Sequence, residues 1–245
     1  MTLIICFSLY SCNRTDKEKT IIRKKIVFVR DIPEKVIEKK VTGNTENLFI
    51  KFGLIDVNTL DSTICIQLKY SDTANFLHFP LYDDLEKAYF PCEVALKVCN
   101  AQYYLKKINP QLSLVIFDAS RPWFAQKLMW DSLKMEVSVK FKFVAPPYLK
   151  SLHNYGCAVD ISIINTENNQ LLDMGSSFDS FEKISEPYRE QYYLNNKKLD
   201  STQIANRNLL RNVMKSAGFT SISSEWWHFN SCSKAFAETH FQLIP

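Results

Sequence analysis

The chain has 245 residues, a formal net charge of +4, 46% hydrophobic residues and 23% charged residues. This composition is typical of a globular protein, and the length suits one large domain or one domain with an appendage. Basic residues near the N-terminus alternate with acidic ones and form no polybasic block, which argues against a nucleic-acid partner. None of the seven cysteines forms a CxxC pair, so a cysteine-rich zinc knuckle is not predicted.

Residues 1–12 form an apolar run that ends in Leu9, Tyr10, Ser11 and Cys12. A Leu-x-small-Cys ending resembles a bacterial lipoprotein signal, in which Cys12 would carry the lipid after cleavage. The basic start of such a signal is missing and Tyr10 is large for its position, so a second interpretation stays open: a disordered N-terminus whose apolar residues pack on the domain. The run is too short to cross a bilayer as a helix, which needs about 20 residues.

The next segments are expected to be a charged tether over residues 13–47, with a strand-like run at residues 25–29, and a globular domain over residues 48–245. Within that domain, β-branched residues predict a strand over residues 63–70. Apolar residues at helical spacing predict a helix over residues 92–108.

The middle of the chain predicts a buried strand over residues 112–120 that leads directly into Arg121. Pro122 suits the first turn of a helix that follows. A further strand is predicted over residues 157–164.

The last part of the chain predicts a long helix over residues 200–219, with Ser201 as its N-cap and Gly218 just beyond its end. Residues 220–229 then return to extended structure. Helices and strands mix without strict βαβ alternation, so the predicted fold class is α+β.

Two short stretches carry the chemistry. In SLHNYGCAVDISI, residues 151–163, His153 and Asp160 stand seven residues apart, and Gly156 permits a bend that brings both side chains to one point. Imidazole nitrogen and carboxylate oxygen are both good Zn²⁺ ligands. In SEWWHF, His228 would supply a third ligand and leave a fourth position open, as in catalytic zinc sites.

Glu225 stands three residues before His228. In a straight strand these two side chains would point to opposite faces, so the spacing predicts a bend or one helical turn between them. Glu225 would then lie beside the metal without binding it, where a general base is needed. A lone histidine is more often a surface or hydrogen-bonded residue, but a buried Asp160 requires a partner. Spacing alone leaves both interpretations open.

Five segments resemble a known family in order along residues 50–240. SLHNYGCAVD and EWWHF are similar to the zinc D-Ala-D-Ala metallopeptidases related to lysostaphin and hedgehog, and YSDTANF, FDASRP and LDMGSSFDSF resemble the VanX-type D-alanyl-D-alanine dipeptidases of peptidase family M15. The resemblance implies a small central antiparallel sheet that carries the zinc site and is flanked by helices.

By position, the resemblance implies that His153, Asp160 and His228 bind one Zn²⁺ per chain and that Glu225 is the general acid and base. It also implies that Arg121 steadies the carbonyl oxygen of the bond being cleaved. A permanently charged arginine at the end of a buried strand suits this role, because its donors are held in a fixed fork.

Asp179 corresponds to the residue that holds the free amino group of the dipeptide, and Ser151 and Tyr70 to residues that contact the substrate. Two alternatives stay open: Arg121 as a structural partner of Asp118, and Asp179 as the cap of a turn. A further cysteine, next to Gly156, is expected on the opposite strand face and is not counted as a ligand.

The resulting prediction is zinc-dependent hydrolysis of D-Ala-D-Ala, or a close D,D-dipeptide, to free D-amino acids in peptidoglycan metabolism. The first alternative is a zinc D,D-carboxypeptidase or endopeptidase on peptidoglycan stem peptides, and the second is a non-catalytic, zinc-stabilised binding module. A small dipeptide is the expected partner, with membrane attachment through a lipid on Cys12. The expected location is the bacterial cell envelope or periplasm, with the cytoplasm as the alternative.

Overall fold

The computed structural model describes residues 44–245, apart from residues 74, 83–84 and 142–143. Cys12, the signal segment and the strand-like run at residues 25–29 lie outside these residues. The first helix, α2, spans Asn44–Lys51 and buries Phe49. The boundary predicted between residues 47 and 48 therefore falls inside a helix.

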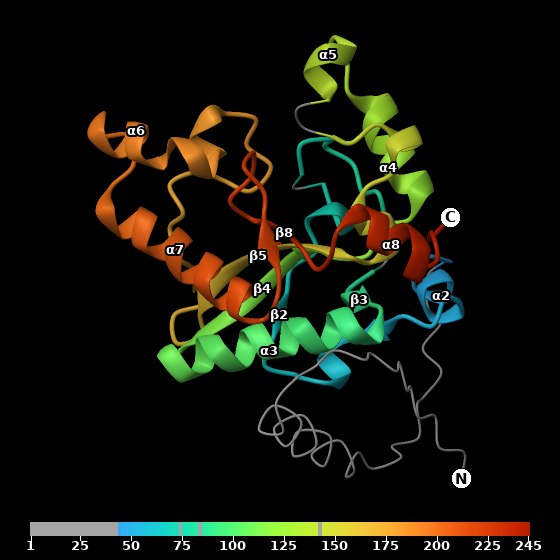
Figure 1. Ribbon diagram of the computed structural model, residues 1–245, viewed down its shortest axis with the longest axis horizontal. Helices are drawn as coiled ribbons and strands as arrows, with labels where there is room; N and C mark the ends of the chain where they lie inside the picture. Colours follow the sequence, from blue (N-terminus) through green and yellow to red (C-terminus); the bar gives the residue numbers. More distant parts are fainter. Residues whose placement is uncertain (1–43, 74, 83–84, 142–143) are drawn as a thin grey trace. The chain divides into compact units, whose positions relative to one another are not determined.

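A six-stranded sheet lies at the centre of residues 44–245, in the order β2-β4-β5-β8-β7, with β6 also paired to β5 (Figure 1). Its strands are β2 (Cys65–Ile66), β4 (Leu112–Asp118), β5 (Ala158–Asn165), β6 (Gln170–Leu171), β7 (Thr220–Ser221) and β8 (His228–Asn230). A separate pair joins β1 (Ile55–Asp56) to β3 (Tyr89–Phe90) in antiparallel orientation.

One pair departs from the predicted antiparallel sheet, because β2 runs parallel to β4. The other pairs of this sheet are antiparallel. A parallel pair needs a long crossover, and the chain between β2 and β4 supplies one that includes helix α3, Cys92–Ile108. The sheet is therefore mixed at this edge, while the predicted combination of helices and strands is confirmed.

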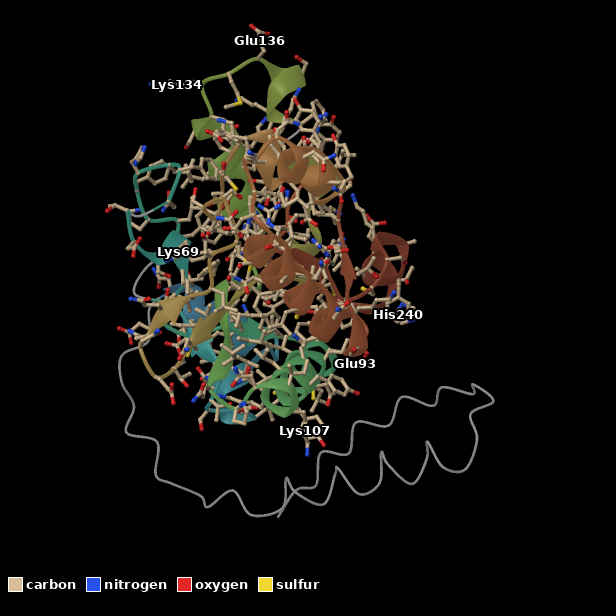
Figure 2. The ribbon with its side chains drawn as sticks, turned by 90° about the vertical axis from the view of Figure 1, so that its left-hand side faces the viewer. Lys69, Glu93, Lys107, Lys134, Glu136 and His240 are labelled. Atoms are coloured by element: carbon tan, nitrogen blue, oxygen red, sulfur yellow. The ribbon has the colours of Figure 1, made fainter. Side chains whose placement is uncertain are left out.

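Helices surround the sheet on more than one side. The remaining α-helices are α4 (Trp123–Ser132), α5 (Val137–Lys140), α6 (Glu190–Asn195), α7 (Ser201–Ser216) and α8 (Lys234–His240). Helix α3 packs against β4 and α7 and has the predicted bounds. Figure 2 shows Lys134 and Glu136 at the tip of the arm that holds α4 and α5. Within the described residues, no helix is both long and apolar enough to span a membrane.

Two local predictions are wrong in detail. The strand predicted over residues 63–70 shortens to β2, because the chain then turns into a 3₁₀ helix at Lys69–Ser71. The N-cap of α7 is Asp200 and not Ser201. The Asp200 carboxylate accepts a hydrogen bond from the Gln203 backbone N–H, and the Gln203 side-chain oxygen accepts one from the Asp200 backbone N–H. Gly218 does follow the helix with a φ of 85°, as predicted.

Strand register positions the chemistry. Asp118 at the end of β4 lies opposite Asp160 on β5, after a register shift that follows Ile116. Asp160 in turn lies opposite His228 on β8. Directly opposite residues of antiparallel strands have their side chains about 4.5–5.5 Å apart on one face. Three neighbouring strands therefore form a row of two carboxylates and one imidazole.

Candidate active site

The turn before β5 adds a second histidine to this row. His153 lies in a 3₁₀ helix, Leu152–Tyr155, in which the Ser151 hydroxyl accepts a hydrogen bond from the His153 backbone N–H at 3.3 Å. Gly156 ends this turn with a φ of 65°, and a Cβ atom there would lie 2.5 Å from Cδ of Pro91. Only glycine fits that conformation and that space, so Gly156 makes the bend that the sequence predicted.

The donor atoms of His153, Asp160 and His228 converge within 4.8 Å of one another. His153 Nε2 lies 3.2 Å from His228 Nδ1 and 3.5 Å from Asp160 Oδ1, and His228 Nδ1 lies 3.0 Å from Asp160 Oδ1. Zinc ligands lie at about 2.0–2.2 Å in tetrahedral directions, which separates them from one another by about 3.3–3.6 Å. The observed spacings are close to those of three tetrahedral ligands.

The other nitrogen of each histidine is already engaged. His153 Nδ1 lies 2.7 Å from the carbonyl oxygen of Ala119, which can only accept, so this nitrogen carries the proton. His228 Nε2 lies 2.8 Å from Oδ1 of Asn230. Such outer contacts fix the ring orientation and the tautomer of metal-binding histidines. Each ring therefore directs its remaining nitrogen to the point where the three donor atoms meet.

The close approach of His153, Asp160 and His228 shifts the pKa values of Asp160 and His228. Burial alone would raise the pKa of Asp160, but the charges and hydrogen bonds of His153 and His228 hold it far below its ordinary value. Burial lowers the pKa of His228, yet the hydrogen bond and charge of Asp160 outweigh burial and raise that pKa to about 9. The raised pKa shows that the position beside the Asp160 carboxylate favours positive charge. A divalent cation suits the same place, because it binds the deprotonated forms of all three.

Glu225 lies beside these three residues in the same cavity, of about 410 Å³. The chain bends at residues 226–227, immediately before β8, which is the bend that the spacing of Glu225 and His228 required. Burial raises the pKa of Glu225 to about 7, although the positive charge of His228 opposes the shift. A carboxyl with a pKa near neutrality can both take and return a proton at physiological pH.

The Arg121 guanidinium lies at the wall of this cavity and is held from several sides. Its Nε and Nη2 donate to Oδ2 of Asp118 at 2.9 and 2.6 Å, and its Nη1 donates to Oε1 of Gln126 at 2.8 Å. Nη2 also lies 3.7 Å from Oδ2 of Asp160. The structural pairing with Asp118 is therefore real, and it fixes a cation beside the converging donor atoms.

Tyr70 and Asp179 form a second polar pair in the cavity. The Tyr70 hydroxyl donates to Oδ2 of Asp179 at 2.8 Å. Asp179 has a φ of 58°, which is unusual for a residue other than glycine. Burial raises the pKa of Asp179 well above its ordinary value, and the charge of Asp160 adds to the shift. Ser151 also lines the cavity, whereas Cys157 is fully buried and does not belong to the converging group.

Comparison with known proteins identifies the family of this chain. The profile of peptidase family M15, described as D-ala-D-ala dipeptidase, matches residues 51–245. The chain belongs to this family. Among relatives, D-alanyl-D-alanine dipeptidase from Escherichia coli K12 is 35% identical over 118 residues, which cover 48% of this chain and 54% of the relative. The match thus spans about half of that relative's length.

Two further proteins show more distant matches. D-alanyl-D-alanine dipeptidase from Enterococcus faecalis V583 is 26% identical over 163 residues, which cover 61% of this chain and 76% of the relative. Among solved structures, an LD-carboxypeptidase aligns with a TM-score of 0.37 and 21% identity over 62% of this chain and 63% of its own.

For this M15 chain, the structure also adds residues that sequence patterns did not single out. Asn230 has a detectable signal, because it stands two residues after His228 and side chains alternate along a strand, which places both on one face. The Ala119 contact is made by a backbone carbonyl, which no residue type announces. Gln126 lies one helical turn beyond Pro122 and carries no chemical motif.

Proposed function

We propose that this chain is a zinc dipeptidase that hydrolyses D-Ala-D-Ala, or a close D,D-dipeptide, to free D-amino acids in peptidoglycan metabolism. The observation that carries the proposal is the convergence of His153 Nε2, Asp160 Oδ1 and His228 Nδ1 at 3.0–3.5 Å in a cavity that also contains Glu225 and Arg121. The names of the M15 relatives supply the substrate class.

The residues present fit zinc as a cofactor, with His153, Asp160 and His228 as its ligands. The donor set of two imidazoles and one carboxylate is one that zinc enzymes use, and the outer nitrogen of each histidine has a fixed acceptor. When bound, the ion would supply a Lewis acid that activates water and polarises the peptide carbonyl.

Glu225 would act as general base and then as general acid. Its carboxylate would accept a proton from the attacking water, and the resulting carboxylic acid would deliver that proton to the departing amine. A pKa of about 7 suits both half-reactions, because neither protonation state is strongly disfavoured near neutrality. Arg121 would stabilise the negative charge that develops on the carbonyl oxygen, since Asp118 and Gln126 hold its guanidinium in one orientation.

Asp179 would bind the free ammonium group of the dipeptide, with Tyr70 holding the carboxylate in place. The raised pKa supports this role, because a buried carboxyl without a cation favours its neutral form, and an ammonium group would favour the ionised form. Ser151 would contact the substrate from the turn that carries His153. An amino-terminal clamp of this kind restricts cleavage to short peptides with a free N-terminus.

The test is release of D-alanine by purified, zinc-loaded protein from D-Ala-D-Ala, L-Ala-L-Ala and N-acetyl-D-Ala-D-Ala. Hydrolysis of the free D,D-dipeptide alone supports both the reaction and the Asp179 clamp. Cleavage of the acetylated substrate would favour the carboxypeptidase alternative, and cleavage of none would favour the binding module. The Glu225→Gln variant should lose turnover and keep its zinc, which distinguishes a catalytic role from a ligand role.

We also propose that the protein works in the bacterial cell envelope, attached through a lipid on Cys12. Support comes from the sequence of residues 1–12 alone. Fractionation of cells that express the wild type and Cys12→Ala tests this: the wild type should sediment with membranes and the variant should not. Equal distribution of the two proteins would contradict the anchor and favour the cytoplasmic alternative.

A further inference from the structure

A free dipeptide presents two opposite charges that lie close together. Two residues of extended chain span at most about 7 Å, so the ammonium and the carboxylate of such a substrate fall within one cavity. The proposed function, on which this inference rests, gives the ammonium to Asp179 and the scissile carbonyl to Arg121. It leaves the carboxylate without a partner, although leaving a charged group unpaired in a cavity is unfavourable.

Apart from the two histidines already described, the basic side chains that line the cavity are those of Arg121, Lys150 and Lys183. The guanidinium of Arg121 is engaged by Asp118 and Gln126. Lys183 is exposed and follows Asp179 by four residues, on the segment that would hold the ammonium. Lys150 is only partly exposed, and among the described residues its side-chain ammonium has no hydrogen-bond or ion-pair partner.

The backbone of Lys150 has a strained conformation. Its φ is 57° and its ψ is 141°, a combination outside the regions that residues with a side chain normally occupy. Its N–H donates to the Pro147 carbonyl at 3.1 Å, which ends the preceding 3₁₀ turn. Strained backbone of this kind clusters at ligand-binding sites, where the side chain is needed in spite of the strain.

Lys150 is also tied to the metal-binding turn. It directly precedes Ser151, whose hydroxyl caps the 3₁₀ helix that contains His153. The Lys150 side chain therefore starts from the turn that presents one of the converging donor atoms, and not from the loop that carries Asp179. Lys150 and Asp179 therefore enter the cavity from different segments of the chain, as two groups that bind opposite ends of one dipeptide would.

From these observations we infer that the Lys150 ammonium binds the terminal carboxylate of the dipeptide and makes the enzyme specific for substrates with a free C-terminus. Asp179 and Lys150 would then select both ends of the substrate by charge. A peptide extended at its C-terminus, or amidated there, would lose the Lys150 contact. Lysine suits this role because its ammonium is a compact charge with three rotatable donors, which can bind a carboxylate in several orientations.

Calorimetric binding separates this inference from the proposed reaction. Zinc-loaded Glu225→Gln protein is titrated with D-Ala-D-Ala and with its C-terminal amide, alone and combined with Lys150→Met or Lys183→Met. A charge-assisted hydrogen bond corresponds to about 10- to 100-fold in affinity. We expect Lys150→Met to weaken dipeptide binding by this factor and to abolish the preference over the amide. Lys183→Met, the matched control, should change neither.

Turnover supplies the second readout. For these measurements Glu225 is left unchanged. Lys150→Met should then raise KM for the dipeptide with little change in kcat, because the contact with the substrate carboxylate is the same in the ground state and the transition state. Lys150→Arg should retain the preference for the free carboxylate. Lys150→Gly should raise KM likewise while raising Tm by about 2–4 °C, because glycine removes the backbone strain.

Unchanged dipeptide affinity and unchanged preference over the amide in Lys150→Met would overturn the inference, as would a larger effect of Lys183→Met. If Glu225→Gln protein binds the dipeptide through Lys150 but the wild type does not cleave it, the inference stands and the proposed reaction fails. If the wild type cleaves the dipeptide and Lys150→Met behaves as wild type, the inference alone fails. Absence of dipeptide binding in every variant would overturn both.

Discussion

Replacing Asp118 by Asn tests how the guanidinium at the cavity wall is held. The Asp118 side chain is fully buried and accepts hydrogen bonds from Arg121 at 2.6 and 2.9 Å and from the Tyr82 hydroxyl at 2.8 Å. Asparagine keeps the shape and removes the charge, which leaves a buried guanidinium without its closest counter-ion. Breaking a buried pair in this way typically costs about 3–5 kcal/mol.

The lower end of that range is expected for Asp118→Asn. Asp160 lies 3.7 Å from the same guanidinium and still compensates part of its charge. About 3 kcal/mol corresponds to a fall in Tm of about 6–12 °C for a domain of this size. Under the proposed function, dipeptidase activity should fall as well, because Arg121 is no longer held in one orientation.

Thermal unfolding followed by circular dichroism measures the effect, and the chain offers a matched control. Lys127 and Asp131 form an ion pair one helical turn apart on α4, with side chains that are 54% and 53% exposed. Asp131→Asn removes the same charge from an exposed pair and should cost less than about 0.5 kcal/mol. If Asp118→Asn lowers Tm no more than Asp131→Asn does, burial of the Asp118 pair does not set its contribution and the reasoning is refuted.

Three further predictions concern the proposed zinc ligands, the proposed general base Glu225 and the turn at Gly156. Asn230→Ala removes the acceptor of His228 Nε2–H and should lower zinc affinity about 10- to 100-fold in chelator competition, with wild-type affinity as the contradicting result. On the acid side, kcat/KM should fall with an apparent pKa at or below about 7, because Glu225 must be ionised to act as base and a nearby cation lowers its pKa. An apparent pKa above about 8 would exclude Glu225 as the base. Gly156→Ala should destabilise the fold by at least about 1–3 kcal/mol in urea unfolding, because its Cβ would meet Pro91, and a smaller loss would mean that this turn adapts.

The long elements were predictable from sequence because their signals are local. Apolar spacing located α3 to the residue, and continuous apolar runs located β4 and β5. The strand predicted over residues 63–70 was too long, because β-branched residues indicate a tendency to extended structure but not whether a neighbouring strand is there to pair with. The chain there leaves the sheet after Ile66 to place Tyr70 against Asp179, which is a tertiary requirement.

The candidate site was predictable where residue type carries the chemistry. Two histidines and a carboxylate were singled out by spacing and resemblance, and the structure brings their donor atoms together. The groups that orient them were not, because the Ala119 carbonyl is common to all residues and Gln126 belongs to no motif. The strained φ of Lys150 is likewise invisible in sequence, since lysine is not a residue that favours such backbone.

The row formed by Asp118, Asp160 and His228 explains why Arg121 is held between two strands. Asp118 and Asp160 lie opposite one another on neighbouring strands, and like charges so placed destabilise a sheet. Arg121 lies between them, 2.6 Å from one carboxylate and 3.7 Å from the other, and so compensates this repulsion. The second oxygen of Asp160 turns to His153 and His228. Asp160 therefore contacts both Arg121 and the two histidines, so a substitution of Arg121 should change the position of the Asp160 carboxylate among the converging donor atoms.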